Sequence, residues 1–330
     1  MKVPLLTSLI QKATKTVIYG VGDVNTIQVE PMLKRFKKVY EEGDSVYVIG
    51  FSRGSASARL FSNRILSKGI VPEIEFLGCF ETVLEDILIN PDQQKRNEAG
   101  FEPSAYLDGK EWDGQLHKNI NQAVHCVALD DDRFHRDIKD NGLASIVTMA
   151  PTLMGQSEKV TEVWFPGQHG SIGGGFYRKE VSDVALEYMK DWLQNLGEGK
   201  SLDFLKPEDV EERALKNSLF GWRKKFENNK ATVKESLSIV PKATGIIPYE
   251  GWESTRYVKA IKNDKTDSKA SVKIHESLLS RLDALDNYVV NKYLGTDLEE
   301  SLPLDRIEVI TSKGNVSEEK TNDLRSKLGK

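Results

Sequence analysis

The sequence predicts an α/β fold, in which helices flank a mostly parallel sheet. Short apolar runs rich in β-branched residues, such as residues 46–49 and 160–165, have the length and composition of buried strands. Between such runs lie longer stretches whose apolar residues recur at helical spacing, such as residues 29–41. At residues 45–59 one predicted strand passes through a tight turn directly into a helix. Strands that alternate with helices in this way favour a parallel sheet.

The composition is that of an ordinary globular protein, with 330 residues, 39% of them apolar and 29% charged. A net charge of −4 gives no reason to expect nucleic acid or an anionic membrane surface as a partner. Cys79 and Cys126 lie in apolar stretches, so we expect buried thiols rather than a disulfide and a reducing compartment such as the cytoplasm. No apolar run has the length of a transmembrane segment, and residues 1–10 are followed by lysines without a convincing signal-peptide cleavage site. Non-classical export stays open as an alternative.

The chain before residue 45 is predicted to contain a helix at 4–15, a strand at 16–19 and a helix at 29–41. The glycines of residues 20–23 permit a tight loop at the carboxyl end of the strand, where open α/β sheets place their sites. The loop is too short for a dinucleotide-binding fingerprint, so no such cofactor is predicted.

Residues 45–59 carry the strongest functional signal. A strand at 46–49 is followed by Gly50-Phe-Ser52-Arg-Gly54 and then by a helix. A G-x-S-x-G sequence between a strand and a helix is typical of a nucleophile elbow, in which the serine hydroxyl projects from the sheet edge. Gly50 and Gly54 would remove the Cβ atoms that clash in such a turn, and the helix that starts at Arg53 would direct backbone N–H groups at an oxyanion. The alternative is a glycine-containing turn without chemistry.

Glu81 directly follows the next predicted strand, residues 73–80. A carboxylate at this point could orient a catalytic histidine and balance its charge, whereas a solvated loop acid is an equally good interpretation. Beyond it, residues 83–89 are apolar around Asp86, and a polar stretch to residue 114 is interpreted as a lid or an ordinary loop.

Residues 116–129 are expected to form a helix that contains His125, which we interpret as a core histidine. The acidic residues 130–132 resemble a metal site only superficially, because no other ligands lie at suitable spacing, and no metal is predicted. Asp130 and Arg133 are interpreted as a structural ion pair. His117 and His135 carry no signal.

His169 is the predicted general base. It lies in a glycine-rich loop after the strand at 160–165, and the chain order serine, acid, histidine is that of α/β-hydrolases. Ser182 is expected to cap a helix at 183–196.

Five segments resemble, in order, an uncharacterised α/β-hydrolase family that includes the phospholipase effectors of bacterial type VI secretion. They are YGVGD, GDSVYVIGFSRGSASAR, EFLGCFETV, HCVALDDDRF, and VWFPGQHGSIGGGF followed by VSDVALEYM. The resemblance covers about residues 16–195 and continues at residues 273–278, which look like the IHxS element of the family. It implies an α/β-hydrolase-like sheet, with Ser52 as nucleophile, Glu81 as acid and His169 as base.

The sequence departs from the family pattern at three points. Glu81 stands where members usually carry Asp, and Ser171 stands where they usually carry Asp two residues after the histidine. The family also opens with a strand bearing an FDGT-like motif, and this sequence begins after it. The resemblance therefore implies that the first strand of the family is missing or that the start is set too late.

Beyond residue 196 the sequence is more charged and mostly helical in pattern. We predict a catalytic domain at 1–196, a mostly helical region at 197–311 with a helix at 276–294, and a disordered tail at 312–330. Four aromatic residues are expected to pack this region against the catalytic domain: Trp222, Phe226, Trp252 and Tyr257.

These observations predict a serine hydrolase that cleaves carboxylic esters without a cofactor, with lipid or phospholipid as the substrate class that the resemblance implies. The backbone N–H of Arg53 would be one oxyanion donor, and the second would come from another loop, such as residues 20–23. The alternative is a catalytically inactive binding protein with the same fold.

Overall fold

A computed structural model gives the structure of the chain. It describes residues 29–82, 116–130, 159–174, 180–204, 258, 261–262, 265–266, 270–285, 288, 290–298 and 301–329.

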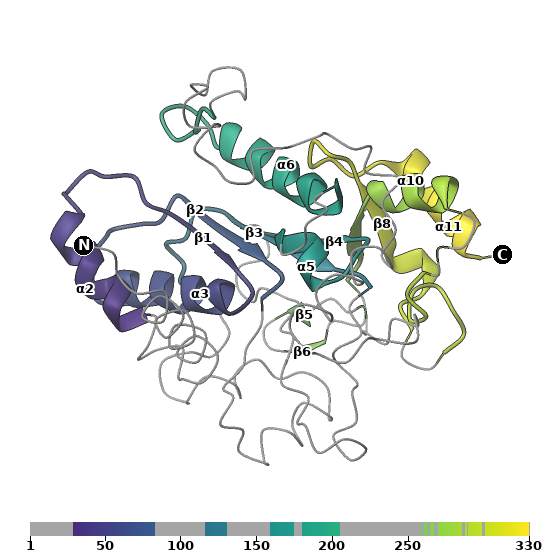
Figure 1. Ribbon diagram of the computed structural model, residues 1–330, viewed down its shortest axis with the longest axis horizontal. Coiled ribbons are helices and arrows are strands. Elements are labelled where there is room, and N and C mark those ends of the chain that lie inside the picture. Colours follow the sequence, from purple (N-terminus) through teal and green to yellow (C-terminus); the bar gives the residue numbers. More distant parts are fainter. Residues whose placement is uncertain are drawn as a thin grey trace, which may run out of the picture. The chain divides into compact units, whose positions relative to one another are not determined.

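Six strands form one sheet in the order β1-β2-β3-β4-β7-β8 (Figure 1). The strands are β1 (Tyr47–Phe51), β2 (Phe76–Phe80), β3 (Ala123–Ala128), β4 (Val160–Phe165), β7 (Val272–His275) and β8 (Ile307–Ile310). The pairs β1–β2, β2–β3, β4–β7 and β7–β8 are parallel. Two short strands, β5 (Ile261–Lys262) and β6 (Lys265–Thr266), form a separate antiparallel pair. The predicted α/β class with a parallel sheet is confirmed.

The described helices lie before, between and after these strands along the chain. They are α2 (Glu30–Val39), α3 (Arg53–Ser67), the short α5 (His169–Gly173), α6 (Glu180–Gln194), α10 (Ser277–Ala284), the 3-10 turn η6 (Leu304–Arg306) and α11 (Glu318–Leu328). Among the described residues, we find no helix that is both long enough and apolar enough to cross a lipid bilayer.

The chain divides into two compact units, and each is described by itself. The first contains α2, β1, α3 and β2, with β3 up to Val127 and β4 up to Glu162. The second contains residues 128–131, the end of β4 from Val163, and α5, α6, β7, α10, β8 and α11. The boundary predicted at residue 196 stays a prediction, because residues 205–257 lie outside the described part, and with them Trp222, Phe226, Trp252 and Tyr257.

In the first unit, α3 packs against β1 and β2 and contributes six residues to the core. Its residues from Ser55 to Ser62 are all buried, including the guanidinium-bearing Arg59. Burial lowers the pKa of Arg59 to about 10, against the raising influence of Cys79 and Glu162. Cys79 and Cys126 are free buried thiols, as predicted, and burial raises the pKa of both.

The segment predicted as a helix at 116–129 instead contains the strand β3. All six residues of β3 are buried, and the strand pairs in parallel with β2. A short apolar run fits a buried strand and a buried helix equally well, and burial on both faces removes the alternation that would distinguish them. The prediction of a helix here is wrong, and the strand places His125 in the sheet.

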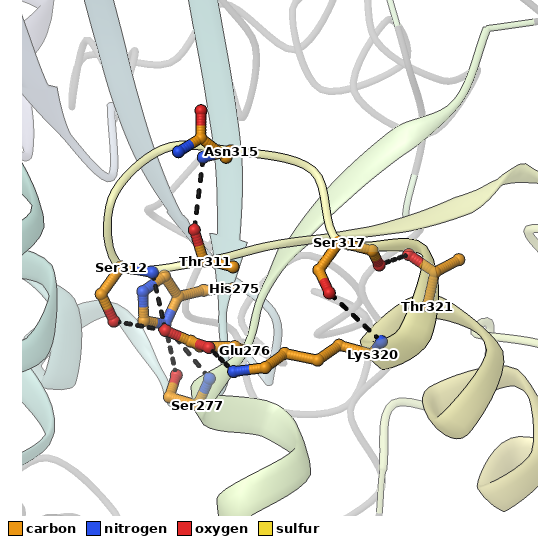
Figure 2. A network of polar contacts seen from close by, with 9 residues as sticks. All are labelled: His275, Glu276, Ser277, Thr311, Ser312, Asn315, Ser317, Lys320 and Thr321. Atoms are coloured by element: carbon orange, nitrogen blue, oxygen red, sulfur yellow. Dashed lines mark hydrogen bonds and ion pairs between the residues drawn. The ribbon is translucent and has the colours of Figure 1, made fainter.

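The second unit contains a polar network that fixes its C-terminal part (Figure 2). The Oε1 atom of Glu276 accepts hydrogen bonds from the backbone N–H of Ser312, at 2.7 Å, and from its hydroxyl, at 2.6 Å. Oε2 of Glu276 pairs with the ammonium group of Lys320. Ser317 caps α11 by accepting from the backbone N–H of Lys320, and the Thr321 hydroxyl donates to the Ser317 carbonyl at 2.7 Å.

Two expectations for the C-terminal region need correction. Residues 318–328, in the stretch predicted to be disordered, form α11, because Ser317 caps the helix and acidic residues lie in its first turn. The helix predicted at 276–294 ends at Ala284, and His275 before it is the last residue of β7. The region thus contributes β7 and β8 to the sheet. Each of these two strands has four residues, which is too short to give a clear strand pattern in the sequence.

His275 makes the second unit sensitive to acid. Its ring is 2% exposed and stacks on Phe165 with 4.5 Å between centroids. Burial lowers its pKa to about 4; Glu276 opposes this shift and Lys320 reinforces it. The unfolded chain takes up this proton below about pH 6.5, whereas the folded chain does so only near its lowered pKa. The free energy of unfolding should therefore fall by about 2 kcal/mol between pH 7 and pH 5 on account of His275 alone.

Urea unfolding of wild type and His275→Asn at both pH values measures this contribution, and the variant should lose that part of the pH dependence. Glu276→Gln is the matched control. Burial raises the pKa of Glu276, but hydrogen bonds from Lys320 and Ser312 lower it overall to about 2. Its stabilising contribution is lost only as the pH falls from about 4.5 towards 2. Identical pH dependence in wild type and His275→Asn would contradict the assignment.

Candidate active site

Ser52 occupies the turn between β1 and α3 with an unusual backbone. Its φ is 60° and its ψ is −130°. The backbone N–H of Ser52 donates to the Phe80 carbonyl at 3.0 Å, and its own carbonyl accepts from Ser55 N–H at 3.0 Å. A non-glycine residue at positive φ stores conformational strain, which persists only where neighbouring contacts impose it. Here those contacts hold the Ser52 backbone at the carboxyl end of the sheet.

Gly50 and Ser55 make this turn possible. A Cβ atom on Gly50 would lie 2.3 Å from the carbonyl oxygen of Gly54, so no larger residue fits. The Ser55 hydroxyl bonds to the carbonyls of Gly50, at 2.7 Å, and Phe80, at 3.0 Å, and so ties the two ends of the turn to β2. Gly54 differs, because a Cβ there would meet nothing within 4 Å. Of the two glycines expected to prevent a clash, only Gly50 does so directly.

The pair Gly50→Ala and Gly54→Ala tests this geometry. Overpacking against backbone typically destabilises by about 1–3 kcal/mol, and the contact at Gly50 cannot be relieved by a side-chain movement. Gly54→Ala should be neutral or stabilising by up to about 1 kcal/mol, because alanine favours the helix. Urea denaturation of both variants measures the difference. Equal stability of the two variants would contradict this description of the turn.

Arg53 is the first residue of α3. The first N–H groups of a helix have no acceptor within the helix, and the helix dipole gives this end a partial positive charge. The turn therefore places Ser52 directly ahead of backbone donors suited to a developing oxyanion.

Glu81 follows β2 and is held close to the Ser52 turn. Its φ is 45°, its side chain is fully buried, and its backbone N–H donates to the Cys126 carbonyl at 2.8 Å. The residue before it, Phe80, is the one that accepts from Ser52. The interpretation of Glu81 as a solvated loop acid is excluded by its burial. Ser52 and Glu81 both belong to the first unit, which brings their backbones together through Phe80.

His125 belongs to a buried network that the sequence did not predict. Its Nε2 accepts the Thr82 backbone N–H at 3.1 Å, so the proton sits on Nδ1, which lies 3.0 Å from the Glu162 carboxylate. Glu162 also interacts electrostatically with the buried Arg59. These contacts fit the interpretation of His125 as a core histidine. Glu162 could have been identified from the sequence as a residue with a buried partner, because a carboxylate in the middle of an apolar strand is rare without one.

His169 is the first residue of α5, which follows β4, rather than part of an extended loop. Its side chain is partly exposed. The Gln168 carbonyl accepts from the N–H groups of Ser171 and Ile172, and Gly174 ends the helix at φ 81°. Gly167, two residues earlier, has φ 128°, so the chain bends sharply before the histidine.

Asp130 lies in the same unit as His169. Its Oδ2 accepts from the Gly167 N–H and the Tyr288 hydroxyl, both at 2.6 Å. Arg133, its predicted ion-pair partner, lies outside the described residues, as do Asp86, His135 and the loop of residues 20–23. The structure describes His169 in the second unit and Ser52 with Glu81 in the first.

The comparisons with known proteins bear on this arrangement. Residues 67–191 match the family model of the type VI secretion system (T6SS) phospholipase effector Tle1-like catalytic domain. This part of the chain is similar to a phospholipase domain. The resemblance found in the sequence is confirmed at the level of the family, over a shorter range than expected. Glu81, Asp130 and His169 lie within the Tle1-like range, and Ser52 lies before it.

The other two comparisons add little to the Tle1-like match. The crystal structure of an uncharacterized protein from Pseudomonas aeruginosa matches with 19% identity and a TM-score of 0.27, covering 50% of this chain and 26% of that chain. This chain thus spans about a quarter of the length of that protein, and a likeness at this level carries no argument. No curated protein matches the sequence.

A serine–histidine contact occurs outside the candidate triad. The Ser277 hydroxyl lies 2.9 Å from Nδ1 of His275, and the same nitrogen accepts the Ser277 backbone N–H at 3.2 Å (Figure 2). Both residues are buried, His275 at the end of β7 and Ser277 at the start of α10. This is the local geometry of a helix end rather than of an activated nucleophile. Within the described ranges, His, Cys, Asp and Glu side chains form no group of three that would hold a metal ion.

Proposed function

We propose that this chain is a serine hydrolase that cleaves carboxylic esters, with lipids or phospholipids as its substrates. The backbone of Ser52 carries the proposal, because a strained serine between a parallel strand and a helix is the geometry of a nucleophile elbow. The Tle1-like match of residues 67–191 supports the lipid class. The two free buried cysteines support a reducing compartment such as the cytoplasm for the folded chain.

In the proposed mechanism, Ser52, Glu81 and His169 act as a triad. His169 takes the proton of the Ser52 hydroxyl as Oγ attacks the ester carbonyl carbon, and the Arg53 N–H stabilises the oxyanion of the tetrahedral intermediate. The intermediate collapses to an acyl-enzyme as His169 returns the proton to the departing alcohol. Water, deprotonated by His169, then releases the acid and regenerates Ser52. The Glu81 carboxylate orients the imidazole and stabilises its protonated form.

The alternative is a catalytically inactive binding protein with the same fold. The Tle1-like match begins at residue 67 and does not include Ser52, which is the observation that favours this alternative. Under it, the strained turn at Ser52 would serve ligand binding alone.

Hydrolysis of a short-chain nitrophenyl ester and of phosphatidylcholine vesicles, together with labelling by a fluorophosphonate, separates the two functions. The hydrolase proposal expects turnover, and a labelled tryptic peptide that contains Ser52. Absence of both turnover and labelling from folded protein would favour the inactive alternative. Turnover of the short-chain ester without turnover of the vesicles would support the esterase chemistry and remove the lipid assignment.

Glu81 variants test the acid of the triad. Glu81 is buried at a positive φ, and the proposal takes its loop to be adjusted to the longer side chain. Glu81→Asp should therefore lower kcat although aspartate is the usual family residue, since displacements of about 1 Å matter in such geometry. Glu81→Gln should lower kcat further, because it removes the charge that stabilises imidazolium.

Asp130→Asn is the competing variant for this test, since Asp130 lies in the same unit as His169 and bonds to Gly167, two residues before it. Steady-state kinetics of all three variants compare the two acids. Full activity in Glu81→Gln, or a loss in Asp130→Asn that exceeds the loss in Glu81→Gln, would refute Glu81 as the triad acid.

A further inference from the structure

Asp130 and Gly167 form a reciprocal pair immediately ahead of His169. The Asp130 N–H donates to the Gly167 carbonyl at 2.9 Å, and the Asp130 carboxylate accepts the Gly167 N–H at 2.6 Å. Gly167 adopts φ 128°, a conformation that favours glycine. These two bonds fix the bend that lies two residues before the histidine.

The segment after α10 holds Asp130 from the other side. Tyr288 donates its hydroxyl to the same carboxylate oxygen at 2.6 Å, and Asn291 donates its side-chain amide to the Leu129 carbonyl at 2.6 Å. The guanidinium of Arg281, which is 1% exposed, lies over the Tyr288 ring, 5.2 Å from its centroid. The segment after α10 thus contacts the two residues that follow β3 through two side chains, and Arg281 of α10 packs on one of them.

We propose that Tyr288 is a positioning residue for the general base, acting on His169 through Asp130 and Gly167. All these residues belong to the second unit. The proposal rests on the proposed function, because it takes His169 to be the base. It assigns to the C-terminal part of the chain a role in catalysis without contact to the substrate.

The burial of the Tyr288 hydroxyl and the charges of Asp130 and Arg281 beside it determine its protonation. Burial raises the pKa of Tyr288 well above its usual value, and the neighbouring Asp130 raises it further against a lowering influence of Arg281. The phenol therefore stays protonated and remains a donor at neutral pH. A carboxylate oxygen that accepts two short hydrogen bonds is held more tightly than one that accepts a single bond. Loss of the phenol should loosen Asp130, and with it the bend that aims His169.

Tyr288→Phe removes the hydroxyl and keeps the ring beneath Arg281. We expect kcat for ester hydrolysis to fall roughly 10- to 100-fold, as for a small displacement of a catalytic group, with KM changed less than about threefold. Labelling of Ser52 by a fluorophosphonate should slow in proportion. Tyr188→Phe is the matched control, because it removes a hydroxyl from a buried tyrosine of the same unit, whose ring packs on Phe165 and His275. Its kcat should stay within about twofold of wild type.

Hydrogen–deuterium exchange gives a readout that does not depend on activity. The peptide spanning residues 166–170 should exchange faster in Tyr288→Phe than in wild type or Tyr188→Phe, because the Gly167 amide loses its fixed acceptor. Should Tyr288→Phe fold poorly, Asp130→Asn serves the same purpose, since the amide keeps the shape but replaces a charged acceptor by a neutral one. The rate losses of Tyr288→Phe and Asp130→Asn should be less than additive in the double variant if both act along one path.

Wild-type kcat and wild-type exchange in Tyr288→Phe, with His169→Ala inactive, would overturn this proposal alone. An equal loss of kcat in Tyr188→Phe, or strict additivity in the double variant, would also overturn it. Retained activity in His169→Ala would instead overturn the assignment of the base in the proposed function, and the positioning role with it. The exchange experiment would then show only that Tyr288 holds the bend at Gly167 in place, without a role in catalysis.

Discussion

Ser52→Ala is expected to lower ester hydrolysis by roughly 10⁴- to 10⁶-fold, the loss seen when the nucleophile of a serine hydrolase is removed. The reason lies in the turn between β1 and α3, where Ser52 stands directly ahead of the first N–H groups of the helix. Alanine keeps the Cβ atom, so the variant should fold with a stability close to that of wild type. Steady-state kinetics, fluorophosphonate labelling and urea denaturation measure the three quantities.

Two further variants sharpen this test. Ser277→Ala changes a serine whose hydroxyl contacts a histidine, and it should leave fluorophosphonate labelling intact. Ser52→Gly should abolish activity while raising stability by about 1 kcal/mol or more, because glycine relieves the positive φ. A labelled peptide that contains Ser277 instead of Ser52 would refute the assignment of the nucleophile.

His169→Ala is expected to lower kcat by roughly 10⁴-fold or more, because the serine hydroxyl loses its base and the leaving alcohol loses its proton donor. The variant should remain folded, since His169 is partly exposed at the first residue of a short helix. Circular dichroism confirms folding, and steady-state kinetics on the same preparation measure the loss.

His125→Ala is the matched control for the base. It removes the acceptor of the Thr82 N–H and the partner of the Glu162 carboxylate, so buried polar groups lose hydrogen bonds. Each such group destabilises by about 1–3 kcal/mol. The main effect should therefore fall on stability, with a smaller loss of kcat than in His169→Ala. A larger loss of kcat in folded His125→Ala than in His169→Ala would exchange the roles of the two histidines.

The case of β3 shows why some elements could not be predicted. Its six residues are buried on both faces, so the sequence contains no alternation, and the choice between strand and helix rests on the neighbouring β2. The strands β7 and β8 could not be predicted either. Each has only four residues, and each is identified as a strand by its pairing with the other. The helix α11 differs, since Ser317 and the acidic residues after it are helix-start signals present in the sequence itself.

The α/β class, the strand–turn–helix around Ser52 and the position of β4 ahead of His169 were predictable from the sequence, because they depend on local backbone requirements. A clash at Gly50 or a positive φ at Ser52 arises between atoms that are near one another in the chain. Three features could be seen only in the folded chain: the burial of Glu81, the bond between His125 and Glu162, and the bond between Tyr288 and Asp130. Each of them depends on residues that are far apart in the sequence. Strand pairing and the requirement that buried charges have partners bring these residues together, and a local sequence pattern contains no information on either.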